Sequence, residues 1–173
     1  QNKKSPGRPW LNIALALIMA LVLLIPSSQY LLAYRQATLG ILTMQSADKA
    51  QSSQEKVEQL NQAAAYFSKA VRNDPRNAEY WSFLAYIEGY FYRILNDQGH
   101  PQAGIYREQS VSFMYKAADL NSYNTEILDR LIRNAAMVGD LEGIIIFGNS
   151  LVKSIPNDPN AYNRIATIWW DVC

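Results

Sequence analysis

The stretch AAAYFSKAVRNDPRNAEYWSFLA, residues 63–85, reads as the end of one helix, a turn and the start of another helix. Ala63 and Phe67 stand four positions apart and share one helical face. Pro75 ends that helix, because proline lacks a backbone donor and restricts the residue before it. Trp81 then opens a second apolar run. This order predicts a junction between two pairs of closely packed helices.

The same pattern returns along the chain. Turn signals NDP, NSYN, GD and PNDP separate helical runs, and the sequence has no strand signature. Pro156 lies 34 positions after Ser122, and Tyr162 lies 34 positions after Leu128. Gly139–Asp140 stands where a turn between the two helices of one pair is expected. A fixed period of this length is the signature of a helical-repeat protein.

These spacings resemble the tetratricopeptide repeat, a helix pair of about 34 residues with the pattern W-x2-L-G-x2-Y…A-x3-F…P. The resemblance covers about residues 45–173 and implies an all-α solenoid of three to four helix pairs. Residues 36–71 fit the first pair poorly and are expected to form helices that continue from the N-terminal segment. An insertion around 93–107 is expected to lengthen a first helix and form a protruding turn. The last repeat is incomplete.

The N-terminal stretch WLNIALALIMALVLLIP carries no charge and begins at Trp10. If Pro26 does not end the helix, the uncharged run covers residues 10–34, where about 20 residues span a bilayer. We therefore predict a transmembrane helix over 10–34, with Trp10 at one interface and Tyr30 and Tyr34 at the other. A cleaved signal peptide and a buried core helix are the alternatives. The run is long for both, and it lacks an A-x-A cleavage site.

Charge sets the expected topology. Three basic residues and no acid lie in the flank 1–9, whereas Arg35 is the only basic residue close behind the run. The positive-inside rule then predicts a single-pass protein with a cytoplasmic N-terminus. The repeat domain, residues 35–173, is expected on the extracytoplasmic side, either periplasmic or on the outer face.

Composition excludes several function classes. The net charge of +1 becomes −2 without the three basic residues of the flank, so no broad basic surface is expected for nucleic acid. The one cysteine, Cys173, and the one histidine, His100, rule out an internal disulfide, a multi-cysteine zinc site and chemistry that needs two histidines. No glycine-rich phosphate loop is found. We predict no catalytic, cofactor or metal residues.

In the tetratricopeptide family the first helices of the pairs line a concave groove that binds partner segments. Carried over by phase, the groove positions are Glu79, Ser82, Tyr86, Tyr90, Glu126, Asp129, Arg133, Met137, Asn160, Asn163 and Thr167. The alternative for Tyr86 and Tyr90 is burial beneath the insertion. Trp169 and Trp170 diverge by about 100°, so one of them faces away from the core. The partner-binding candidates are Tyr86, Tyr90, Arg133, Met137, Trp169 and Trp170.

Two functions fit these features. The first is a membrane-anchored scaffold or adaptor for protein–protein interaction, an accessory or assembly subunit of a larger membrane complex. Its expected partners are other protein subunits and the bilayer, with no small-molecule substrate. The second is the last span and repeat region of a polytopic glycosyltransferase, because LLIPSSQYLLAYRQA…AAAYFSKAVRNDPRNAEYW resembles that junction in O-antigen ligases and polymerases. The chain starts at Gln1, which allows missing upstream spans.

Overall fold

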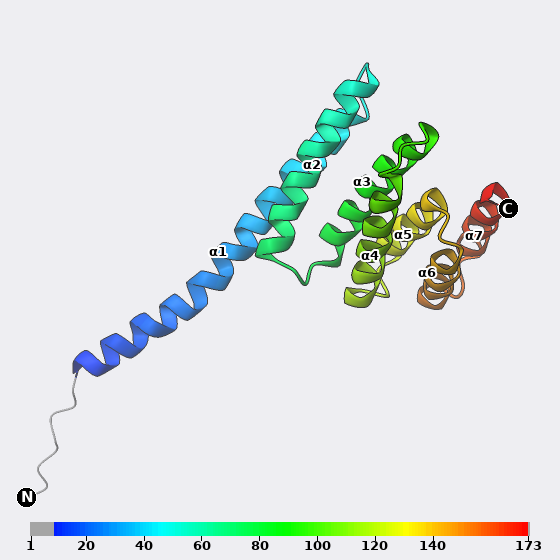
Figure 1. The fold of residues 1–173 in the computed structure, drawn as a ribbon. Helices are drawn as coiled ribbons and strands as arrows, with labels where there is room; N and C mark the ends of the chain where they lie inside the picture. Colours follow the sequence, from blue (N-terminus) through cyan, green and yellow to red (C-terminus); the bar gives the residue numbers. More distant parts are fainter. Residues whose placement is uncertain (1–8, 173) are drawn as a thin grey trace, which may run out of the picture.

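The computed structural model describes the backbone of residues 9–172 (Figure 1). Side chains in this range are described except at 9–12, 16, 20–26, 164 and 169–172. The helices are α1 Pro9–Ala47, α2 Ser53–Asn73, α3 Ala78–Asp97, α4 Ala103–Leu120, α5 Thr125–Val138, α6 Leu141–Ser154 and α7 Pro159–Val172. Residues 9–172 contain no strand. The predicted all-α fold is therefore confirmed.

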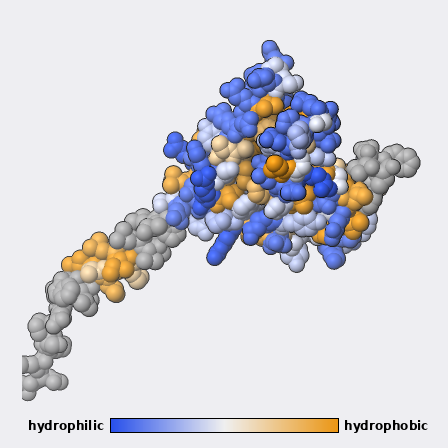
Figure 2. All heavy atoms as spheres, in the orientation of Figure 1, coloured by the Kyte–Doolittle hydropathy of each residue, from blue (hydrophilic) through white to orange (hydrophobic). Residues whose placement is uncertain are grey.

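Helix α1 is a single helix of 39 residues, and Pro26 does not end it. Its N-terminal half projects away from the other helices (Figure 1), and Figure 2 shows an apolar band on this projecting segment. Ile13, Leu15 and Leu17 are about 60% exposed there. Judged on the residues that the structure describes, no helix combines the length and the apolar character that a bilayer crossing requires.

The C-terminal half of α1 packs against α2 as an antiparallel hairpin. Small residues make the close approach possible, since Ala33, Ala37 and Gly40 are all buried at this contact. A Cβ atom on Gly40 would come within 2.8 Å of the Phe67 ring. The predicted continuation of the N-terminal helix into the array is confirmed, because α1 runs without a break into this hairpin.

The turns at NDP, NSYN, GD and PNDP fall where the sequence predicts them, whereas the α1–α2 turn before Ser52 had no predicted signal. Ser52, Asn77, Asn124 and Asp140 each cap a helix, with a side-chain oxygen that accepts a hydrogen bond from a backbone N–H of the first turn. Gly139 ends α5 in the left-handed conformation, with φ of 68°, which glycine adopts without steric cost. Polar caps therefore mark where α2, α3, α5 and α6 begin, and Gly139 marks where α5 ends.

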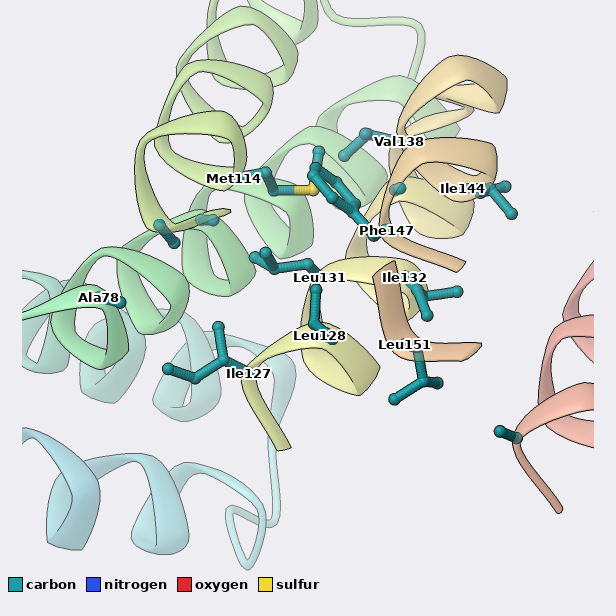
Figure 3. Close-up of a cluster of buried hydrophobic side chains, with 14 residues drawn as sticks. Ala78, Met114, Ile127, Leu128, Leu131, Ile132, Val138, Ile144, Phe147 and Leu151 are labelled. Carbon is teal, nitrogen blue, oxygen red and sulfur yellow. The ribbon is translucent and has the colours of Figure 1, made fainter. Parts of the chain in front are cut away.

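Two apolar clusters hold the helices together. The first joins α1, α2 and α3 around Phe67, whose ring stacks on Phe83 with 4.7 Å between centroids. The second joins α3 through α7, and Figure 3 shows Met114, Leu131 and Phe147 converging within it. Trp81 of α3 packs against both clusters, so α3 is the shared wall between them.

Helices α3 and α4 are longer than the next pair. They have 20 and 18 residues, against 14 in both α5 and α6. The predicted insertion therefore adds the last turns of α3, a short connection and the first turns of α4. Gly99 turns this connection with φ of 64°. The longer α3 extends past the end of α5, which shapes the surface described next.

Candidate functional site

Helices α3 and α5 pack side by side and present an open surface with two depressions. The larger, of about 680 Å³, is called the α3–α5 pocket here; its lining residues are Tyr86, Tyr92, Arg93, Asn96, Asp97, Arg133, Ala136, Met137 and Gly139. The smaller, of about 430 Å³, is lined by Thr125, Glu126, Asp129, Arg130 and Arg133. Arg133 belongs to both, so the two depressions adjoin.

A close helix contact forms the floor of the α3–α5 pocket. Gly89 of α3 faces α5 so closely that a Cβ atom there would clash with Asn134 Oδ1 and lie 2.7 Å from Met137 Cε. Asn134 is 1% exposed and donates a hydrogen bond to Ser110 Oγ at 2.9 Å. Ser110 Oγ in turn donates to the Ala85 carbonyl at 2.9 Å. This buried chain of polar contacts fixes α3, α4 and α5 relative to one another.

The pocket wall comes from the lengthened end of α3. Arg93, Asn96 and Asp97 lie in its last turns and line the pocket together with Gly139, which follows the last residue of α5. A first helix of 14 residues, like α5, would end before these positions. These last turns of α3, which lie in the predicted insertion, therefore form this wall.

Two arginines of the adjoining depressions have different surroundings. Arg130 donates a hydrogen bond to Ser82 Oγ at 2.6 Å, and its guanidinium lies 3.9 Å from the Phe83 ring centroid. Burial lowers the pKa of Arg130, and carboxylates nearby act in the opposite direction. Arg133 is exposed and forms an ion pair of 2.9 Å with Asp129. Arg130 therefore supports the fold, whereas Arg133 can still reach a ligand.

Arg93 is the second basic group that a ligand can reach. It is exposed, and it forms no ion pair within the part of the chain that the structure describes. Asp97, one turn further along α3, is the carboxylate of the same pocket. Tyr86, Tyr92 and Met137 supply the apolar surface between these charged groups. The pocket therefore offers aromatic contact together with two guanidinium groups.

Three predicted partner-binding residues meet in this pocket. Tyr86, Arg133 and Met137 line it although α3 and α5 are separated in the sequence by a whole helix. Tyr90 does not line it; this residue packs against the first apolar cluster, with Lys56 Nζ 4.8 Å from its ring centroid. Tyr90 therefore packs towards α2, and not beneath the insertion as the alternative in the sequence analysis had it.

Other predicted sites lie elsewhere. The side chains of Trp169, Trp170 and Trp10 lie outside the described residues. Tyr30 and Tyr34 are 59% and 67% exposed on α1. Their predicted roles at a partner or a membrane interface stay predictions.

Sequence reasoning missed two features. The first is the pocket wall: the sequence predicts a lengthened first helix and a protruding turn, but not that Arg93 lines a pocket. Arg93 follows Tyr86 by seven positions, and this helical spacing is the signal that could have found it. The second is Glu88 of α3, seven positions after Trp81. Its Oε2 atom is buried without a hydrogen-bond partner, and burial raises the pKa of Glu88 to about 6.

Two predicted absences concern metal-ligating groups and His100. No group of three or more metal-ligating side chains comes together among the described residues. His100 lies in the exposed connection after α3, where its Nδ1 atom accepts a hydrogen bond from the Gln102 N–H at 3.3 Å. This contact is local to the turn and brings no nucleophile or acid to the imidazole.

Comparison with known proteins adds no relative. No protein-family model matches the sequence, and no curated protein matches it either. The function therefore has to be argued from the chain itself.

Proposed function

We propose that this protein is a membrane-anchored adaptor, in which a tetratricopeptide-like array binds a segment of a partner protein in the α3–α5 pocket. The observation that carries the proposal is the convergence of Tyr86, Arg133 and Met137 in one depression. Tyrosine and arginine are enriched among the residues that dominate binding energy at interfaces. The anchored array would hold its partner as an accessory or assembly subunit of a membrane complex.

The pocket's chemistry suggests the kind of segment it takes. Tyr86 and Met137 suit an apolar side chain, while the guanidinium groups of Arg93 and Arg133 suit a carboxylate. Arginine pairs with carboxylates through two parallel hydrogen bonds, which adds geometric specificity. Asp97 in the same pocket disfavours a second carboxylate beside it. We infer a segment with one apolar anchor residue and an acidic residue close to it.

Support for the anchor comes from the sequence of the projecting part of α1. The run 10–34 has no charged residue, and the described leucine, isoleucine and methionine side chains between 13 and 19 are exposed. Isolated exposed apolar residues are common, whereas a contiguous exposed stretch marks an interaction surface. The side chains of 20–26 lie outside the described residues, so this part of the proposal rests on their sequence. Anchoring confines partners to one surface and raises their effective concentration.

Affinity purification of the full chain in mild detergent, followed by mass spectrometry of bait and partners, tests the proposal. Tyr86→Ala is the informative variant, and Tyr123→Ala is its matched control because Tyr123 is 79% exposed and lies outside the pocket. Truncation of a hot-spot residue costs about 2 kcal/mol or more, which is about a 30-fold loss of affinity. We expect that loss for Tyr86→Ala only, with helical circular dichroism unchanged.

Equal retention of partners by both variants would contradict the proposal. A bait that runs alone and far heavier than 19.6 kDa, with further hydrophobic peptides upstream, would point instead to a fragment of a polytopic glycosyltransferase.

A further inference from the structure

The α1–α2 hairpin brings the end of α2 back beside the middle of α1 (Figure 1). Ala33 is fully buried at this contact and marks where the body of the protein begins along α1. The start of α3 lies close to this level, since Tyr80 is buried in the same apolar cluster as Ala33 and Ala37. The α2–α3 connection, residues 74–77, is therefore the edge of the body that faces the projecting half of α1.

Four exposed basic residues gather at this edge, and we call them the basic edge: Arg35, Lys69, Arg72 and Arg76. None of them forms an ion pair with the residues that the structure describes. The carboxylates of Asp74 and Glu79 lie on the same edge, so four positive and two negative charges leave a net charge of +2. The edge is positive although the body of the chain is slightly acidic overall.

The basic edge lies a short distance from the apolar run, and one continuous helix connects the two. The continuously apolar part of the run 10–34 ends at Ile25, before Pro26, and Ala33 follows eight residues later in the same unbroken helix. Eight residues of helix rise about 12 Å. The headgroup layer is about 5 to 7 Å thick on each side of the bilayer core, and the Debye length is about 8 Å at physiological salt. The basic edge therefore falls within reach of the lipid phosphates.

We propose that the basic edge binds the headgroups of anionic lipids and so holds the body of the protein against the bilayer. The inference rests on the proposed anchor, because α1 sets the height of the edge. Each basic residue near an anionic surface contributes attraction that fades within one Debye length. Contact at this edge also fixes how the α3–α5 pocket is presented to partners in the same membrane.

Two lysines of the hairpin allow an internal comparison. Lys69 belongs to the basic edge, and Lys49 lies in the α1–α2 turn at the far end of the hairpin, about 20 Å further from the bilayer. Both are exposed. The full chain is reconstituted in nanodiscs of phosphatidylcholine, with or without phosphatidylglycerol. A brief pulse of an acetylating reagent and mass spectrometry then give the labelling rate of each amine.

A surface potential of about −30 mV raises the proton concentration near the bilayer. An amine there is protonated more of the time and reacts about three-fold more slowly with the reagent. We expect this slowing at Lys69 in anionic discs, no change at Lys49, and recovery at high salt. Arg72→Gln/Arg76→Gln should return Lys69 toward its rate in phosphatidylcholine, whereas the control Lys49→Gln should leave the slowing of Lys69 intact.

Two results overturn the proposal in distinguishable ways. A chain that enters both kinds of disc but labels at Lys69 equally in them has an anchor and no lipid-binding edge. A chain that enters neither disc has no anchor, and the proposed function fails with this inference.

Discussion

Gly89→Ala tests how closely α3 and α5 approach each other at Gly89, beside the α3–α5 pocket. Alanine in a helix interior is normally favoured over glycine by about 1 kcal/mol. Here the added methyl group would clash with Asn134 Oδ1 and lie 2.7 Å from Met137 Cε and 3.2 Å from Ser110 Oγ. Overpacking of this kind costs about 1 to 3 kcal/mol. Displacing Asn134 also weakens its buried hydrogen bond, which is worth about 1 kcal/mol.

The balance is a net destabilisation of about 2 kcal/mol, which lowers Tm by about 4 to 8 °C in a chain of this size. Thermal unfolding by circular dichroism in mild detergent measures the shift. Gly104→Ala is the matched control, because Gly104 is also helical but has open space where a Cβ atom would be. We expect it to leave Tm unchanged or raise it slightly. If Gly89→Ala is as stable as the parent protein, the close α3–α5 contact is wrong.

Three further predictions concern single side chains. Phe67→Ala removes a fully buried ring and should destabilise the protein by about 3 to 5 kcal/mol in urea unfolding, where a loss below about 1 kcal/mol would contradict its central position. Glu88→Gln tests the buried carboxylate: its raised pKa of about 6 favours the protonated form in the folded state, so the parent protein should lose stability as pH rises from about 4.5 through 6. Unfolding midpoints at pH 5 and pH 7 should show this loss for the parent and not for the glutamine variant; equal losses would refute it. Asp140→Ala removes the cap of α6, in which Asp140 Oδ1 accepts from the Gly143 N–H at 3.1 Å, and should cost about 1 kcal/mol by the same urea assay, with no change as the contradicting result.

The helix boundaries were readable from the sequence because their signals are local. Proline, glycine and capping residues act within a few positions, so the turns at Asn77, Asn124 and Gly139 were found by spacing alone. Phe67 was placed correctly in the core for the same reason, since its period identifies one helical face. The sequence left open whether Pro26 ends its helix. Proline kinks some helices and ends others, and the outcome depends on the surrounding structure.

The pocket was less predictable because it depends on relative helix lengths. Tyr86 and Tyr90 stand one helical turn apart and both pack against the first apolar cluster, yet only Tyr86 also lines the pocket. Nothing in their spacing separates the two, since the difference arises from what α2 and α5 place beside them. Arg93 lines the pocket because α3 extends past the end of α5. This can be recognised only when the ends of both helices are known. Glu88 escaped notice because a carboxylate at a core position breaks the apolar pattern used to find such positions.

Site-specific photo-crosslinking tests the central claim most directly. A photo-reactive amino acid is placed at position 93 or position 133 of the full chain in its native membrane, with position 123 as the exposed control. The account predicts that positions 93 and 133 crosslink to the same segment of one partner protein and that position 123 does not. Crosslinks of equal yield from all three positions, or none from 93 and 133, would contradict a partner-binding pocket between α3 and α5.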